Sequence, residues 1–172
     1  MATEVAVGAS LAGVRAMACM KHVGLNVAAD PLYSVSYMGV NGGLVIVVAD
    51  DPGLYSSQNE QDTRMVARAA QIPVIEPSDS AEAKDYFKMA FELSEQFDRP
   101  FIFRTTTRLA HSQGLVELQE RVVPEDKVYE KNIQKNVMMP GNAKVRHIEI
   151  EKRNLELAEA ANTLPINRVE MN

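Results

Sequence analysis

The sequence has very few of the residues that build disulfides and metal centres. Its 172 residues include one cysteine, Cys19, and three histidines that lie far apart. One cysteine excludes an internal disulfide and cannot hold an iron–sulfur cluster, so we expect no metal site in this chain. Because Cys19 lies in an apolar stretch, we predict a buried and unreactive thiol.

Long apolar runs and an excess of positive charge are also missing. The longest aliphatic run, residues 44–49, is far too short to span a bilayer, and the first residues lack the basic start of a signal peptide. The formal net charge of −5 argues against nucleic acid or an anionic membrane as the main partner. We therefore expect a cytoplasmic protein.

The pattern that is present is an alternation of strands and helices. Apolar residues make up 46% of the chain and charged residues 24%, which fits one domain with a substantial core. Strands are expected at residues 16–20, 43–50, 72–77 and 100–106, and the second is apolar throughout, as in a strand covered on both faces. This order predicts an α/β fold, a three-layer sandwich whose mostly parallel sheet is flanked by helices.

Helix signals divide the remaining chain. Asp30 is expected to cap one helix, and Asp79, with Glu82 three residues later, another. We place the domain at residues 1–120, and we expect residues 121–172 to form a linker and a charged helix toward a next domain. The expected helices span residues 4–17, 30–39, 61–71, 79–97 and 143–162, with a turn at 21–26.

A polar cluster follows the best predicted strand, in the stretch VIVVADDPGLYSSQNEQD (residues 45–62). Ligands of parallel α/β sheets bind at the carboxyl ends of the strands. The turns at residues 21–26, 50–59, 76–79 and 105–112 are therefore the candidate binding region.

Several of these stretches resemble one enzyme family. The resemblance is carried by MKHVGLNVAADP, VVADDP and SSQNEQD, and it continues in RTTTRLAHSQG and MMPGNAKVRHIEIEKRN. They are similar to the alpha subunits of indolepyruvate:ferredoxin oxidoreductases, within the 2-oxoacid:ferredoxin oxidoreductase family. The resemblance extends over essentially the whole chain.

This resemblance implies a pyrimidine-binding (PYR) domain of a thiamine diphosphate enzyme. Such enzymes decarboxylate aryl pyruvates, transfer the acyl group to coenzyme A and pass electrons through iron–sulfur clusters to ferredoxin. It implies that a beta subunit binds the diphosphate and its Mg²⁺, since no G-D-G motif followed by Asn appears here. Alpha subunits of the family are several times longer and carry their 4Fe-4S clusters elsewhere, so we expect a fragment that is inactive alone.

The family's catalytic glutamate has no clear counterpart. It begins the pattern E-x-x-A-x-x-x-A-x-G, whose later anchors match Ala2, Ala6 and Gly8. The glutamate would then fall before Met1, as in an N-terminally truncated domain. Glu4 lies on a different helical face, so it is a weak substitute and we assign no catalytic residue.

The resemblance makes six residues candidates for cofactor binding. They are His22, Asn26, Asp50, Asp51, Gln58 and Asn59. Each also has a purely structural interpretation: turn chemistry for the first two, loop capping for the aspartates, and capping by Ser57 or Asn59 of a helix that begins near residue 60.

Other residues are better explained without a ligand. Arg108 and His111 follow the last strand, where a charged loop is the simpler interpretation. The methionines Met17, Met20, Met38 and Met65 are expected in the core. No arginine stands where pyruvate enzymes of the superfamily hold the substrate carboxylate, so recognition of that group is unexplained.

Two other functions stay open from the sequence. A PYR subunit of a two-chain thiamine diphosphate-dependent decarboxylase would have about this length. A non-catalytic α/β assembly domain could use an uncovered face to form a homodimer.

Overall fold

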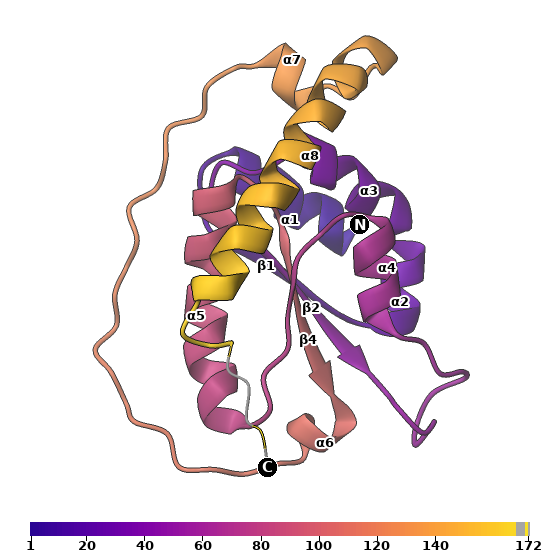
Figure 1. Ribbon diagram of the computed structural model, residues 1–172, viewed down its shortest axis with the longest axis vertical. Helices are drawn as coiled ribbons and strands as arrows, with labels where there is room; N and C mark the ends of the chain where they lie inside the picture. The colour runs from indigo at the N-terminus through magenta and orange to yellow at the C-terminus, as the bar shows by residue number, and fades with distance from the viewer. Residues whose placement is uncertain (168–170, 172) are drawn as a thin grey trace.

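The computed structural model describes residues 1–167 and 171, and it shows helices on both faces of a parallel sheet (Figure 1). The strands of this described part are β1 (Ala16–Lys21), β2 (Leu44–Asp50), β3 (Val74–Ile75) and β4 (Phe101–Thr106). They are ordered β1-β2-β4-β3, and every pairing is parallel. The predicted α/β sandwich is confirmed.

The described residues contain eight helices. They are α1 (Ala2–Leu11), α2 (His22–Val27), α3 (Ala29–Met38), α4 (Thr63–Ala69), α5 (Ser80–Phe97), α6 (Thr107–Ala110), α7 (Ile133–Asn136) and α8 (Pro140–Thr163).

Strand β2 shows how the sequence pattern builds the two layers. Side chains alternate between the faces of a strand, and apolar residues occupy both faces here. Leu44, Ile46 and Val48 pack toward α1, α2, α3 and α4, whereas Val45 and Val47 pack toward α5 and the end of α8. A continuously apolar strand therefore marks a sheet buried on both sides.

The predicted helix boundaries need several corrections. The first helix is shorter than expected, and the supposed turn at residues 21–26 is mostly helix α2. Because α3 follows α2 after Ala28, Asp30 lies in the first turn of α3 and does not cap it. The cap of α4 is Asp62, which accepts from the Arg64 amide. The cap of α5 by Asp79 is confirmed.

Strand β1 lies at the edge of the sheet, and its outer face is uncovered. Helix α5 packs against β2 and β4, and it leaves Met17 55% exposed. Cys19 on the same face is exposed as well, so the prediction of a buried thiol was wrong. Met65 is exposed on α4, whereas Met20 and Met38 are partly buried.

Asp98 joins three segments that lie far apart in the sequence. It ends α5 in the left-handed region at φ 50°. Its carboxylate accepts from the Val40 amide at 2.8 Å, from Lys135 Nζ at 2.7 Å and from Arg153 Nη2 at 2.6 Å. The contact with Arg153 ties the C-terminal cap of α5 to α8.

Helix α8 packs against the domain. Ile150 is fully buried, and the Arg146 side chain donates to the carbonyl of Tyr37 at the end of α3. A long segment without helix or strand, residues 112–132, leads to α7 and α8 along the outside of the molecule (Figure 1). We call it the strap. The direction of α8 toward a further domain stays a prediction.

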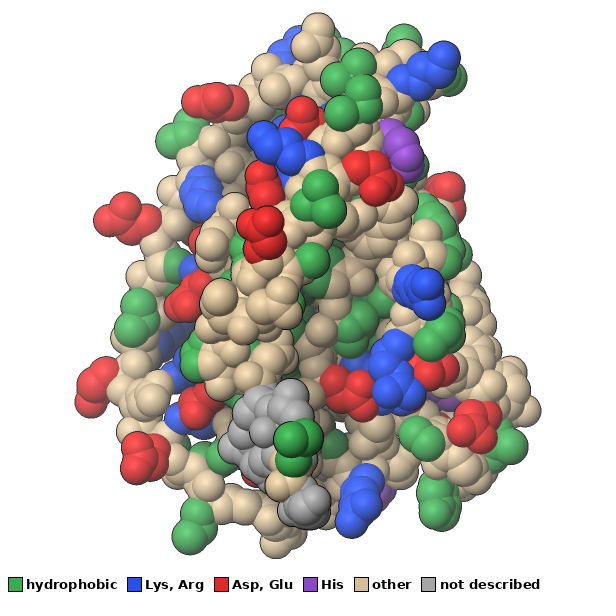
Figure 2. Space-filling view, viewed as in Figure 1, with side chains coloured by type: hydrophobic (Ala, Val, Ile, Leu, Met, Phe, Trp, Pro, Cys, Tyr) green, Lys and Arg blue, Asp and Glu red, His purple; other side chains and the backbone are tan. Residues whose placement is uncertain are grey.

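Charged side chains are mixed over the visible surface. Figure 2 shows acidic and basic groups interspersed on this face rather than gathered into a patch of one sign. None of the helices in the described residues is long and apolar enough to cross a membrane.

Candidate functional site

The carboxyl ends of β1, β2 and β4 meet at one edge of the sheet. In the parallel register Lys21 lies beside Ala49, and Asp50 lies beside Thr106. This edge is at the bottom of Figure 1, where the loop after β2 and helix α6 are close to the strand ends. Parallel pairing therefore brings together three of the four turns selected from the sequence.

Asp50 anchors the start of α4 and pairs with a buried arginine. Its carboxylate accepts from the Thr63 amide at 3.0 Å, from the Thr63 hydroxyl, and from Arg104 Nε at 2.7 Å. Arg104 also pairs with Glu76, which follows β3. The side chains of Asp50 and Arg104 are almost fully buried, so the loss of either would leave a buried charge without this partner.

Asp51 holds the loop that follows β2. Its carboxylate accepts from the Ser57 hydroxyl at 2.6 Å, from the Ser56 amide at 2.7 Å and from the Thr107 hydroxyl at 2.8 Å. These hydrogen bonds favour the charged form, so they hold the pKa of Asp51 well below its usual range, with the Ser57 bond as the largest cause. Asp51 thus joins the loop to the start of α6, directly after β4.

The same loop contains a tight turn. The Leu54 amide donates to the Asp51 carbonyl at 3.1 Å, with Pro52 and Gly53 between them. Gly53 has φ 85°, which fits the third position of a type II turn, where glycine avoids a steric penalty. Leu54 also has a positive φ, 60°, which is uncommon for a residue with a side chain.

Lys21 extends from the end of β1 toward this loop. Its Nζ donates to the Ser56 carbonyl at 2.7 Å and to the Ser57 hydroxyl at 2.6 Å. Ser57 therefore accepts from Lys21 and donates to Asp51, and it connects a surface cation to a buried carboxylate.

His22 is the one candidate residue with an unused buried hydrogen-bonding atom. Its side chain is 1% exposed, and its Nε2 lies 3.1 Å from the Asn59 carbonyl oxygen. Since a carbonyl only accepts, Nε2 carries a hydrogen, and in the tautomer with a single ring hydrogen Nδ1 is an acceptor. Nδ1 is buried and has no partner in the described residues. Buried polar atoms without partners are rare, and each calls for an explanation.

The remaining candidates form an amide chain at the surface. Asn26 Nδ2 donates to Gln61 Oε1 at 2.7 Å, and Gln61 Nε2 donates to Asn59 Oδ1 at 2.6 Å. Gln58 is exposed beside them. Lys21, His22, Asn26, Ser57, Gln58, Asn59 and Gln61 are called the polar rim below.

A shallow pocket of about 500 Å³ opens on one side of the polar rim, at Lys21, Ser57 and Gln58. Its lining combines one cation with hydroxyl, amide and apolar groups, which are the types found in small-molecule sites. The lining residues are Lys21, Val23, Leu54, Tyr55, Ser56, Ser57 and Gln58.

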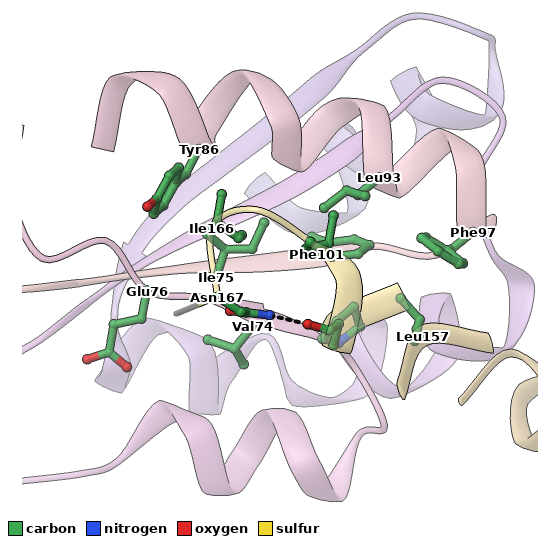
Figure 3. Close-up of a pocket in the computed structure, with 13 residues that line it drawn as sticks. Val74, Ile75, Glu76, Tyr86, Leu93, Phe97, Phe101, Leu157, Ile166 and Asn167 are labelled. Carbon is green, nitrogen blue, oxygen red and sulfur yellow. Dashed lines mark hydrogen bonds between the residues drawn. The ribbon is translucent and has the colours of Figure 1, made fainter. Parts of the chain in front are cut away.

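A second cavity, of about 180 Å³, lies between α5, β3 and the end of α8 (Figure 3). Leu93 and Phe101 lie along it, and Asn167 donates to the Ala161 carbonyl at 2.7 Å, the hydrogen bond drawn in the figure. Its walls are mostly apolar, so we interpret it as a packing gap.

Three other residues considered from the sequence lie apart from the polar rim's hydrogen bonds. Glu4 is exposed on α1 and pairs with the amino group of Met1, which lowers the pKa of its carboxyl. Arg108 lies exposed on α6, and His111 is exposed at its C-terminal end. Within the described residues no group of three or more histidine, cysteine or acidic side chains could hold a metal ion.

Sequence reasoning missed Lys21, Thr63, Arg104 and Thr107. Arg104 and Thr107 lie at the end of a predicted strand, where their charge and hydroxyl were a usable signal. Thr63 could not be found in this way, because its contact with Asp50 depends on where α4 begins.

An all-parallel sheet with polar groups gathered at its carboxyl edge defines a ligand-binding α/β domain. Residues 1–162 match the family described as "Pyruvate flavodoxin/ferredoxin oxidoreductase, thiamine diP-bdg". The chain belongs to this family, and it is a thiamine diphosphate-binding domain of the 2-oxoacid oxidoreductase class.

Curated relatives agree with this assignment. The chain is 54% identical to the indolepyruvate oxidoreductase subunit IorA of Archaeoglobus fulgidus, over 88% of the chain and 25% of that protein. It is 49% identical to the subunit of the same name from Pyrococcus horikoshii, over 99% of the chain and 27% of that protein. The chain thus spans about a quarter of the length of these relatives. The resemblance stated from sequence motifs is confirmed.

A solved structure shows the same fold at low sequence identity. It is a 2-oxoglutarate:ferredoxin oxidoreductase from Magnetococcus marinus with 2-oxoglutarate, coenzyme A and succinyl-CoA bound. The TM-score is 0.59 at 17% identity, over 91% of this chain and 35% of that one.

Proposed function

We propose that this chain is the pyrimidine-binding domain of an indolepyruvate:ferredoxin oxidoreductase alpha subunit. In this role it orients and activates thiamine diphosphate that a beta subunit holds jointly with it. The whole enzyme converts aryl pyruvates and coenzyme A to aryl-acetyl-CoA in the cytoplasm and passes electrons to ferredoxin through 4Fe-4S clusters outside this chain. The relatives' names support this proposal, and their length makes a naturally short decarboxylase subunit or an assembly domain less favoured.

The observation that carries the proposal is the polar rim with its unpartnered histidine nitrogen. The rim offers neutral donors and acceptors from Asn26, Gln58 and Asn59, and Nδ1 of His22 is an acceptor without a donor. These groups fit an aminopyrimidine ring, which carries ring nitrogens and an exocyclic amine. Bound thiamine diphosphate supplies the carbon nucleophile that attacks a 2-oxo group.

The same residues do not fit a magnesium diphosphate. Mg²⁺ prefers carboxylate and phosphate oxygens, and the two aspartates of the edge already accept hydrogen bonds from protein donors. Asp50 and Asp51 therefore position α4 and the loop, and we assign the diphosphate and Mg²⁺ to the beta subunit. In this arrangement His22, Asn26, Gln58 and Asn59 face the cofactor.

The test compares two cofactors that differ only in the pyrimidine ring. Thiamine diphosphate and oxythiamine diphosphate, which lacks the exocyclic amine, are titrated with Mg²⁺ into the beta subunit alone and into its complex with this chain. We expect the complex to prefer thiamine diphosphate by about tenfold, the size of one good hydrogen bond. The beta subunit alone should show no preference.

Substitution of His22 identifies the source of the preference. His22→Phe keeps a ring of similar size and removes the acceptor, so the complex should lose its discrimination. Arg108→Ala, on α6, is the matched control and should keep it. A complex that binds thiamine diphosphate no better than the beta subunit alone would exclude the proposed function.

A further inference from the structure

We propose that Lys21 binds the carboxylate of the 2-oxoacid substrate and that Tyr55 forms the wall against its aryl group. This inference rests on the proposed function, and it assigns substrate recognition to the pocket beside the polar rim. It addresses the substrate carboxylate, for which the sequence offered no arginine.

Among the residues that the structure describes, Lys21 is the one charged side chain that lines this pocket. Its ammonium has three hydrogens, and two are donated to neutral oxygens, the Ser56 carbonyl and the Ser57 hydroxyl. Within the described residues its ammonium forms no ion pair with a carboxylate. One N–H of the ammonium is therefore available to an incoming anion.

The position of Lys21 is set by a hydrogen-bond relay. Ser57 donates its hydrogen to Asp51 at 2.6 Å, so the lone pairs of its oxygen face Lys21. Asp51 cannot rotate toward Lys21 without losing its bonds to Ser56 and Thr107. The cation is thus held in place without being neutralised by direct contact, as a site for a carboxylate requires.

The other side of the pocket is apolar and exposed. Tyr55 is 81% exposed and Leu54 is 48% exposed, although both are large hydrophobic residues. A Cβ on Gly53 would lie 3.1 Å from Cε2 of Tyr55, so the ring lies closely over the glycine. Leu54 is presented from a left-handed backbone conformation that a non-glycine residue adopts at a cost.

These features match an aryl-substituted 2-oxoacid. A charge-assisted hydrogen bond at Lys21 would hold the carboxylate, and an aromatic ring would lie against Tyr55 and Leu54. The pocket volume of about 500 Å³ is within the range of small-molecule sites. A pocket with one cation and one aromatic wall favours a ligand that carries both a carboxylate and an aromatic ring.

Two unreactive probes separate the charge from the ring. Indole-3-propionate and its neutral amide are titrated into the complex of this chain with its beta subunit. We expect the carboxylate to bind at least about tenfold more tightly than the amide, which is the usual effect of one charge-assisted hydrogen bond. Equal binding of the two probes would overturn the inference.

Four variants separate the contribution of the Lys21 charge to probe binding from that of the Tyr55 ring. Lys21→Met should lower the affinity for the carboxylate about tenfold and leave the amide within about twofold. Lys21→Arg should restore part of the loss, and Tyr55→Ala should weaken both probes. Lys131→Met, an exposed lysine of the strap, is the matched control. Equal weakening of both probes by Lys21→Met would contradict a charge contact.

Turnover separates this inference from the proposed function. In the assembled enzyme Lys21→Met should raise KM for indolepyruvate with little change in kcat, and thiamine diphosphate affinity should stay unchanged. Wild-type enzyme that oxidises no 2-oxoacid would exclude the proposed function. Wild-type turnover with an unchanged KM in Lys21→Met, or a loss of cofactor affinity in that variant, would exclude only the role of Lys21.

Discussion

The loop after β2, residues 51–62, and the strap, residues 112–132, both lack helix and strand, yet they are held very differently. Asp51 binds two groups of the loop and one of α6. The strap is held by scattered contacts at the surface. Lys84 and Lys88 of α5 donate to the Glu117 carbonyl and the Gln119 side chain. The Lys127 amide donates to the Gly13 carbonyl at 2.9 Å, and Asn41 donates to the Val128 carbonyl at 3.1 Å. A segment without helix or strand is held in a fixed conformation here where a buried side chain accepts several of its hydrogen bonds.

Gly13 illustrates the weaker kind of attachment. A Cβ at this position would collide with the carbonyl oxygen of Lys127, so the strap can run close to the backbone here. Elsewhere the strap exposes its apolar side chains, and Leu115 is 99% exposed. The strap runs along the surface of the domain, whereas the loop is hydrogen-bonded to the buried Asp51 at the edge of the sheet.

The largest loss of stability is expected at the buried ion pair between Asp50 and Arg104. Asp50→Ala leaves Arg104 buried without its partner and removes the anchor of Thr63. We expect a loss of about 3–5 kcal/mol in the free energy of unfolding, measured by denaturant titration. Glu125→Ala in the strap should change it by less than about 0.5 kcal/mol. Similar losses in both variants would contradict the comparison.

A smaller effect is expected at the junction where the strap reaches α7 and α8. Asp98→Ala removes the acceptor for Val40, Lys135 and Arg153 together. We expect a loss of about 1–3 kcal/mol and faster hydrogen exchange in α8, because each lost partner leaves a donor unpaired. Unchanged exchange in α8 would show that Ile150 holds this helix without Asp98.

The loop and the strap should also respond differently to acid. The pKa of Asp51 is lower in the folded chain than its ordinary value of 3.8, so its stabilising effect is fully present above about pH 5. It is lost as the pH falls below the unfolded value toward the lower folded one. Hydrogen exchange of residues 52–58, corrected for intrinsic rates, should therefore rise between about pH 5 and pH 2.

The strap supplies the reference for this acid response. Its corrected exchange should change less over the same range, because in the described residues its one ion pair with the domain, Lys127–Glu95 at 3.5 Å, is at the surface. In Asp51→Asn the acid dependence of the loop should disappear. An identical rise in the variant would assign the effect to another group.

The smallest effect is expected for the apolar side chains of the strap. Leu115→Ser replaces a side chain that is 99% exposed. We expect the free energy of unfolding to change by less than about 0.5 kcal/mol, as for surface positions generally. A loss above about 1 kcal/mol would show that the strap packs against the domain more closely than its exposure indicates.

Much of the architecture could be predicted from local signals. The apolar run of β2, the cap at Asp79 and the alternation of elements predicted the parallel sheet, and the polar stretch after β2 predicted its binding edge. The site was predicted less completely. Asp50 and Asp51 do lie at this edge, but their hydrogen-bond partners depend on α4, α6 and β4. The cofactor contacts of the six candidate residues stay predictions.

The sequence by itself determined the sheet, its parallel direction and the edge at which polar groups gather, because these follow from hydrophobic period and element order. Only the tertiary structure decided that Cys19 is exposed, since its strand lies at an edge that α5 does not cover. It also decided that Lys21 meets Ser57 and that Asp98 meets Arg153, because these contacts join residues 36 and 55 positions apart. Local patterns specify elements, whereas such pairings exist only after the elements have packed.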